Sequence, residues 1–279
     1  MARRTIRGVA VNFEDVGPSE APVVVMSNSL AADLSMWDAQ AACLSRSYRV
    51  VRYDTRGHGG TQATPGDYSL DLLAGDVIDL LDALGVGRCH FVGLSLGGMT
   101  GQVLALKAPK RLASLTLCAT FASADPGLWD SRAATARKEG LASIVDATID
   151  RWLTPAFRAG NPKVVDRIRR MILGTSPAGY AGCAAAIRDM DLSGVAERID
   201  VPTLLIAAAQ DPSATTGLMA DLHRRIRGAR METVADAAHL FTIEQPEMTN
   251  RLLKRFLDET QGAEGSGQGL AGRHRRTAN

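Results

Sequence analysis

Residues 92–98 read Val92-Gly93-Leu94-Ser95-Leu96-Gly97-Gly98, a Gly-x-Ser-x-Gly turn between an apolar strand pattern and an amphipathic helix pattern. A sharp turn of this kind holds a serine exposed beside a base, which a hydroxyl needs in order to act as a nucleophile. Glycines at 93 and 97 remove the Cβ atoms that would collide where the turn is tightest. The pattern alone also fits a packing turn, so its interpretation depends on the rest of the chain.

The segments on either side of this turn alternate between strand and helix patterns. A continuous apolar run at 22–26 predicts a strand that is buried on both faces, and further strand patterns follow at 48–53, 89–93 and 115–119, with helical patterns between them. This alternation predicts a parallel sheet with right-handed crossovers. A loosely alternating stretch at 5–14 predicts an edge hairpin before the first buried strand.

Residues 121–199 interrupt the alternation with helical patterns alone, separated near Pro155, Pro162 and Pro177. Helices inserted after a strand predict a cap over the strand ends. The strand pattern then resumes at 201–207. The predicted organisation is a mostly parallel α/β core of residues 1–120 and 200–261, an inserted helical cap of 121–199, and a disordered, Gly-rich basic tail of 262–279.

Composition excludes several classes of function. The 279 residues are 46% hydrophobic, enough for one large α/β core. The 32 Lys and Arg residues nearly cancel the 30 Asp and Glu residues, so we expect no broad basic surface for nucleic acid. The four cysteines have no paired spacing, which is typical of reduced thiols in the cytosol. No apolar run approaches the ~20 residues of a membrane helix. We expect a cytoplasmic protein with no nucleic-acid or membrane partner, no metal and no cofactor.

A nucleophilic Ser95 requires a histidine base, and His239 is the one histidine that lies in a loop directly after a late strand pattern. The acid that orients the base should be Asp211, because it follows the strand ending near Ala209 and so falls on the same sheet edge as Ser95. Asp236, close to His239 in sequence, is the alternative acid. The order Ser95, Asp211, His239 is the order of nucleophile, acid and base in α/β-hydrolases.

Attack on an ester also requires N–H donors for the developing oxyanion. We expect one from the backbone of Leu96, at the start of the helix, and the other from Leu30, in the loop after the first buried strand. The loop 54–59, Asp-Thr-Arg-Gly-His-Gly, is similar to a metal or phosphate site, but it lacks a second carboxylate–histidine cluster and is better interpreted as a buried structural turn. A dinucleotide fingerprint does not fit 93–98, because a serine occupies a position that needs glycine.

Six stretches together carry a likeness to a known family. They are Met36-Trp37-Asp38, RYDTRGHG at 52–59, GLSLGGM at 93–99, RWLTP at 151–155, GYAGCAAAIRD at 179–189 and AAHL at 237–240. They resemble the 3-oxoadipate enol-lactonases of the α/β-hydrolase superfamily, over about residues 10–258. The resemblance implies hydrolysis of 3-oxoadipate enol-lactone to 3-oxoadipate, in the β-ketoadipate route of bacterial aromatic catabolism.

The substrate that this resemblance implies is a small lactone with a free carboxylate. Burying that charge requires a cation or several donors, and the cap offers Arg132, Arg151 and Arg188, with Trp152 as an apolar wall. Two stretches depart from the family pattern and bear on substrate fit: Pro-Ser-Ala-Thr-Thr at 212–216 and Phe-Thr at 241–242.

Two other interpretations use the same sequence features. A general carboxylesterase or C–C bond hydrolase would employ the same three residues. A non-catalytic ligand-binding protein could share the fold, but all three positions of the triad are filled.

Overall fold

The computed structural model describes residues 1–271, with side chains up to residue 262. Eight strands form one sheet in the order β1-β2-β4-β3-β5-β6-β7-β8. β2 is antiparallel to β1 and β4, and all other neighbours are parallel, which confirms the predicted fold class. The strands are β1 (Ala2–Ile6), β2 (Val9–Val16), β3 (Val23–Ser27), β4 (Arg49–Tyr53), β5 (Cys89–Leu94), β6 (Leu112–Cys118), β7 (Thr203–Ala208) and β8 (Arg230–Val234).

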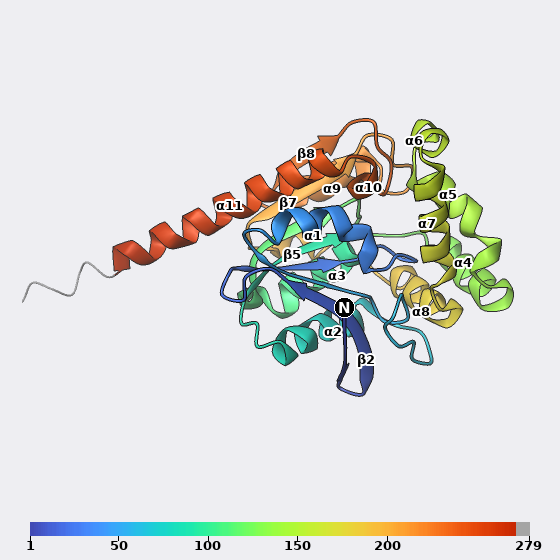
Figure 1. The fold of residues 1–279 in the computed structure, drawn as a ribbon, viewed down its shortest axis with the longest axis horizontal. Helices are drawn as coiled ribbons and strands as arrows, with labels where there is room; N and C mark the ends of the chain where they lie inside the picture. The colour runs from blue at the N-terminus through green and yellow to red at the C-terminus, as the bar shows by residue number, and fades with distance from the viewer. Residues whose placement is uncertain (272–279) are drawn as a thin grey trace, which may run out of the picture.

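Helices cover both faces of the sheet. α1 (Asp38–Leu44) packs with α11 (Pro246–Ala271) on one side, and α2 (Leu70–Ala83) packs with α3 (Leu96–Lys107) on the other (Figure 1). α9 (Thr216–Arg225) contacts β7 and β8. Every residue of β5, β6 and β7 is buried, which explains why these strands read as continuous apolar runs.

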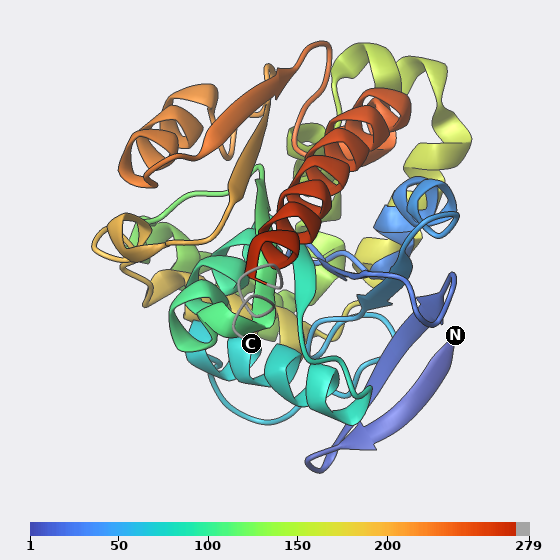
Figure 2. The same ribbon diagram turned by 90° about the vertical axis from the view of Figure 1, so that its left-hand side faces the viewer.

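Five helices form the cap at one end of the sheet (Figures 1 and 2). They are α4 (Pro126–Glu139), α5 (Val145–Trp152), α6 (Pro155–Gly160), α7 (Pro162–Leu173) and α8 (Pro177–Arg188). The chain enters and leaves the cap side by side: Ser123 pairs with Asp191 in an antiparallel bridge, and the N–H of Leu192 donates to the carbonyl of Ala122 at 2.8 Å. The cap is therefore one insertion that closes on itself at its base.

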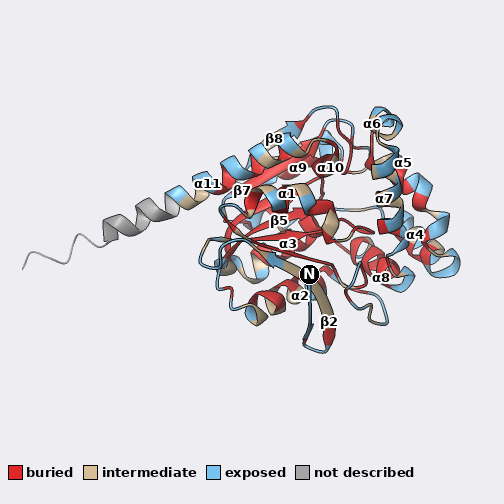
Figure 3. Ribbon diagram, viewed as in Figure 1, coloured by how far each residue is buried: buried red, intermediate tan, exposed pale blue. Residues whose placement is uncertain are grey.

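One cap helix, α8, is in direct backbone contact with the core. A Cβ added to Gly57 would lie 2.3 Å from the Cα of Gly179, so each position accepts only glycine. The N–H of Ser176 donates to Gly57, and the N–H of Tyr68 donates to Gly182. Figure 3 shows α8 largely buried, whereas α4 to α7 expose one side. The cap therefore packs on the core through the 54–68 loop.

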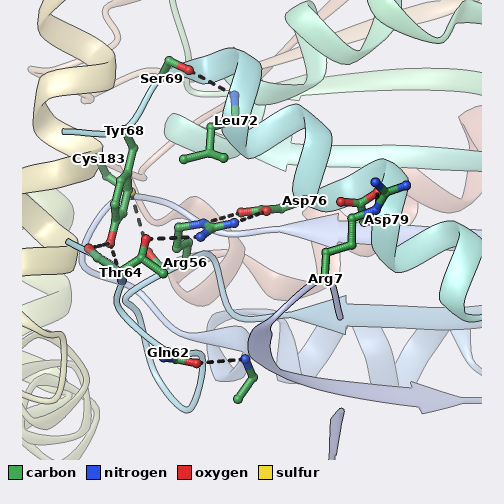
Figure 4. A network of polar contacts seen from close by, with 11 residues as sticks. Arg7, Arg56, Gln62, Thr64, Tyr68, Ser69, Leu72, Asp76, Asp79 and Cys183 are labelled. Carbon is green, nitrogen blue, oxygen red and sulfur yellow. Dashed lines mark hydrogen bonds and ion pairs between the residues drawn. The ribbon is translucent and has the colours of Figure 1, made fainter. Parts of the chain in front are cut away.

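Arg56 makes contacts that hold the 54–68 loop in place (Figure 4). Its guanidinium forms a paired contact with Asp76 of α2 and donates to the hydroxyl of Thr64. Its carbonyl accepts from the Cys183 thiol of α8, and its side chain lies over the ring of Tyr68 at 6.0 Å. The loop therefore joins α2, α8 and the sheet, in agreement with its interpretation as a structural turn.

The C-terminal segment differs from the sequence prediction. We expected disorder from residue 262, but α11 continues to Ala271. Buried Leu252, Leu253, Phe256 and Leu257 anchor the helix, and an anchored helix extends at little cost per residue. The predicted tail at 272–279 lies outside the described residues.

Two further expectations concern the described chain. No helix within residues 1–271 has the length and apolar character needed to cross a membrane. All four cysteines are free thiols.

Candidate active site

The turn after β5 places Ser95 in a strained backbone conformation, with φ 55° and ψ −111°. Both flanking glycines are required by close packing: a Cβ on Gly93 would lie 2.2 Å from the carbonyl oxygen of Gly97, and one on Gly97 would lie 2.3 Å from that of Ser27. The N–H of Ser95 is held by the carbonyl of Cys118 at 2.8 Å. This is the geometry of a nucleophile elbow, in which the fold sustains local strain to present one hydroxyl.

His239 and Asp211 are brought together as expected. Nδ1 of His239 donates to Oδ2 of Asp211 at 2.7 Å, and both side chains are almost fully buried. Burial raises the pKa of Asp211, but His239 and the N–H groups of Ser213 and Ala214 lower it by more, so the net pKa is below its usual value. The backbone carbonyl of Asp236, the alternative acid, accepts from the side-chain amide of Gln245, and Asp236 has a φ of 51°. Asp211 is therefore the acid partner of His239.

A short segment after β3 links the histidine to the elbow. The carbonyl of Asn28 accepts the N–H of Gly97 at 3.0 Å, and Oγ of Ser29 lies 3.4 Å from Nε2 of His239. Because Nδ1 carries the proton given to Asp211, Nε2 is the basic nitrogen and accepts from the Ser29 hydroxyl. Ser29 was not predicted as a site residue. Its position directly before the expected oxyanion donor Leu30 was the available signal.

The two expected oxyanion donors have free backbone positions. Leu96 is the first residue of α3, so its N–H has no carbonyl partner within that helix. In the loop after β3, the N–H of Ala32 donates to the carbonyl of Ser29, and the N–H of Gly97 donates to the carbonyl of Asn28. Among the described residues, no hydrogen bond uses the N–H of Leu30. Both donors belong to segments that are fixed by the elbow, which suits a pre-organised oxyanion site.

The cap contributes a wall and a cavity beside this site. The Trp152 ring stacks on the His239 ring with centroids 6.5 Å apart and planes 24° apart. A cavity of about 230 Å³ lies between α4, α5 and the loop after Asp211. Its lining includes Arg132, Arg151, Trp129 and Ser213.

The two cavity arginines are half-buried, and neither forms a salt bridge with any described residue. The guanidinium of Arg132 lies 4.6 Å over the Trp129 ring, and Arg151 donates to the hydroxyl of Thr148. Burial lowers the pKa of Arg151, and the neighbouring charge of Arg132 lowers it further. Two like charges held close together favour an anion between them.

Arg188 is placed differently from our expectation. Its guanidinium forms ion pairs with Asp67, Asp130 and Asp189. It does not line the cavity that holds the other two arginines. These three carboxylates already neutralise Arg188, so we remove it from the candidate substrate contacts.

The histidine of the 54–59 loop makes a local contact. His58 is fully buried, and its Nδ1 contacts the carbonyl of Arg56 at 3.1 Å. No group of three or more candidate ligands gathers anywhere in the described part of the chain.

The two departures from the family pattern flank the site without disturbing its geometry. Ser213 and Ala214 supply N–H groups to Asp211. Phe241 is fully buried at the start of α10 (Phe241–Glu244), and the carbonyl of Thr242 accepts from Gln40. Both stretches support the residues beside them.

Comparisons with known proteins agree with this architecture. The family model for the alpha/beta hydrolase fold matches residues 22–246. The 3-oxoadipate enol-lactonase 2 of Acinetobacter baylyi is 37% identical over 257 residues, covering 90% of this chain and 96% of the relative. The crystal structure of the enol-lactonase from Burkholderia xenovorans LB400 is 38% identical with a TM-score of 0.90, covering 92% of this chain and all of that one.

An esterase is also similar. The malate-bound thermophilic esterase from Thermogutta terrifontis is 29% identical with a TM-score of 0.88, and the match covers 93% of this chain and 98% of that one. Family match, sheet topology and elbow geometry agree over the whole core, so the chain belongs to the α/β-hydrolase fold family and, within it, to the 3-oxoadipate enol-lactonases.

Proposed function

We propose that this protein opens 3-oxoadipate enol-lactone to 3-oxoadipate by acyl transfer through Ser95. The observation that carries the chemistry is the hydrogen bond of 2.7 Å between His239 and Asp211. Residues 28 and 29 connect His239 to the elbow, because Ser29 contacts the imidazole and Asn28 accepts from Gly97. The similarity to enol-lactonases over nine-tenths of the chain supports the choice of substrate.

The proposed reaction assigns one role to each of these groups. Nε2 of His239 takes the Ser95 hydroxyl proton while Oγ attacks the lactone carbonyl, and the N–H groups of Leu30 and Leu96 receive the oxyanion. The bond from the acyl carbon to the enol oxygen breaks and opens the ring. The enolate oxygen, which stays on the acyl chain, takes the proton from the His239 imidazolium, and the enol then ketonises. An enolate is a good leaving group, so little acid assistance is required. Water then attacks the acyl-enzyme, with His239 again as base.

We further propose that Arg132 and Arg151 bind the free carboxylate of the substrate. They are the two cations that line the cavity beside Pro212 and Ser213, and neither forms a salt bridge with a described residue. The carboxylate of Asp125, which also lines this cavity, accepts from the N–H groups of Gly127 and Leu128 at the start of α4. Trp152, stacked on His239, would supply the apolar wall of the site. Such a site suits a small anionic lactone.

A general carboxylesterase is the second candidate function, favoured by the similarity to the Thermogutta esterase. One assay separates the two: kcat/KM for 3-oxoadipate enol-lactone measured beside kcat/KM for p-nitrophenyl acetate. We expect the lactone to be preferred by at least about 100-fold, because a bound carboxylate adds a charge-assisted contact that the neutral ester lacks. Equal or reversed preference would sink the lactonase proposal in favour of the esterase.

A further inference from the structure

Glu244, at the end of α10, is a buried carboxylate that is held by neutral donors. Oε1 accepts from both the N–H and the hydroxyl of Thr154, each at 2.8 Å, and Oε2 accepts from the N–H of Ala238 at 2.5 Å. Glu244 is only 7% exposed, and no cation within the described residues forms an ion pair with it. Burying such a charge is costly, so its hydrogen bonds must hold both partners firmly.

The two partners of Glu244 belong to parts of the molecule that are far apart in sequence. Thr154 opens α6 of the cap, two residues after Trp152, and Ala238 directly precedes His239. A second bond runs beside the first: the N–H of Leu240 donates to the carbonyl of Trp152 at 2.9 Å. Both neighbours of His239 are therefore fastened to cap residues 152–154.

The hydrogen bonds between residues 152–154 and residues 238–240 bear on the face of the His239 ring, which Asp211 does not contact. Asp211 fixes Nδ1, whereas Nε2 has only the long contact of 3.4 Å with the Ser29 hydroxyl, so the orientation of the ring also depends on what packs against its face. The stacked Trp152 ring limits rotation of the imidazole, and it can do so only while residues 152–154 stay seated against the loop 238–240. Glu244 holds the two segments in that register.

We propose that Glu244 is a positioning residue that couples the seating of the cap to the orientation of the His239 imidazole. The inference rests on the proposed function in one respect only, that His239 serves Ser95 as its base. It adds a carboxylate that touches neither substrate nor reacting atoms and yet sets the rate of nucleophilic attack.

Glu244→Gln tests the coupling with little change of shape. The amide keeps one acceptor oxygen but turns its NH₂ toward a donor, so one of the two attachments must break. We expect the second-order rate of Ser95 labelling by a small fluorophosphonate to fall at least tenfold, with a parallel fall in kcat for the lactone and a KM within threefold of wild type. Measurement well below the melting temperature separates this effect from loss of folded protein.

Glu247→Gln is the matched control, because it makes the same chemical change three residues later in the exposed first turn of α11. It should label at the wild-type rate. Thr154→Val provides an independent variant: it removes the hydroxyl donor on the cap side and keeps the N–H. We expect it to slow labelling about threefold, and to add nothing further in the Glu244→Gln background.

Labelling within twofold of wild type in Glu244→Gln would overturn the proposal. If that variant does not fold, labelling of Thr154→Val at the wild-type rate would overturn it equally. A tenfold loss of labelling in a protein that does not hydrolyse the lactone would uphold the positioning role while removing the proposed substrate. A wild-type chain that fluorophosphonate does not label would refute both.

Discussion

Each edge of the sheet holds a buried histidine in contact with a serine hydroxyl, and of these two histidines only the one at the carboxyl edge also contacts a carboxylate. At the carboxyl edge, Nε2 of His239 meets Ser29 and Nδ1 meets the carboxylate of Asp211. At the amino edge, Nδ1 of His90 lies 2.7 Å from Oγ of Ser114, and the Gln261 amide donates to Nε2 at 2.7 Å. A carboxylate stabilises an imidazolium, whereas an amide donor opposes it.

The surroundings of the two histidines reinforce the contrast. Burial, together with the charge of Arg88, lowers the pKa of His90 to about 4, so this ring stays neutral at physiological pH. The elbow at the other end of β5 leads into the N-terminus of α3, whose dipole favours developing negative charge. The cavity at that end is lined by two arginines and one acid, Asp125, whereas the cavity of about 300 Å³ beside His90 is lined by Glu20 and Arg88. The two edges therefore differ in the partner of the histidine, a carboxylate at one and an amide at the other, and in the helix N-terminus that lies beside the elbow.

Removing one serine from each edge should break the comparison most sharply. Ser95→Ala should lose more than about 10³-fold in kcat/KM for the lactone, because no other group can form the acyl-enzyme. Ser114→Ala should stay within about threefold. Steady-state kinetics on both variants checks this, and retention of more than one part in a thousand by Ser95→Ala would refute covalent catalysis at that residue.

Neutralising the acid should make the carboxyl edge more like the amino edge. Asp211→Asn presents an amide to Nδ1 of His239 and favours the wrong tautomer, so we expect a fall of about 10⁴-fold in kcat. Asp236→Asn is the matched control and should remain near the wild-type rate. A small effect at 211 together with a large one at 236 would reassign the acid.

Removing the cavity cations should affect anionic substrates alone. Arg151→Met or Arg132→Met should raise KM for the lactone by about 10- to 100-fold, the equivalent of one charge-assisted hydrogen bond. Turnover of neutral p-nitrophenyl acetate should stay within about twofold. Arg188→Met serves as the control, because its guanidinium faces three carboxylates outside the cavity. An unchanged KM in both cavity variants would remove the anion site.

Acidification should reveal the amino-edge histidine through stability. The folded pKa of His90 is about 4, below the ~6.5 of an unfolded histidine, so the unfolded state binds the extra proton between these values. Stability from the neutral ring is complete above pH ~6.5 and is lost as pH falls toward 4, by up to about 3 kcal/mol. Urea unfolding of wild type and His90→Gln at pH 7 and pH 5 measures the difference. An equal loss in both proteins would contradict the assignment.

Much of the fold could be predicted because its signals are local. The apolar runs of β3, β5 and β6 and the glycines of the elbow lie within a few residues of the structures they determine. The pairing of Asp211 with His239 followed from one geometric rule, that carboxyl ends of parallel strands meet at a single edge.

The remaining features depend on contacts between distant segments. Ser29 reaches His239 across 210 positions, and Glu244 reaches Thr154 across 90. No periodicity encodes either contact. We expected Arg188 to contact the substrate, because the spacing of residues in the sequence does not show that Asp67 and Asp130 lie beside its guanidinium. Docking of the cap decides the contacts of Glu244 and Arg188, and assembly of the core loops decides that of Ser29. All three are properties of the folded surfaces.

The contact between Gly57 and Gly179 has a consequence for changing specificity by exchanging caps. The two glycine backbones lie against each other, and Gly57 also has a φ of +77°, so the two positions must be inherited together. A cap taken from a relative and inserted at the Ser123–Asp191 junction would carry its own α8 but meet this chain's loop. Any such chimera should therefore transplant residues 54–68 along with the helices, treating two stretches of sequence as one interchangeable part.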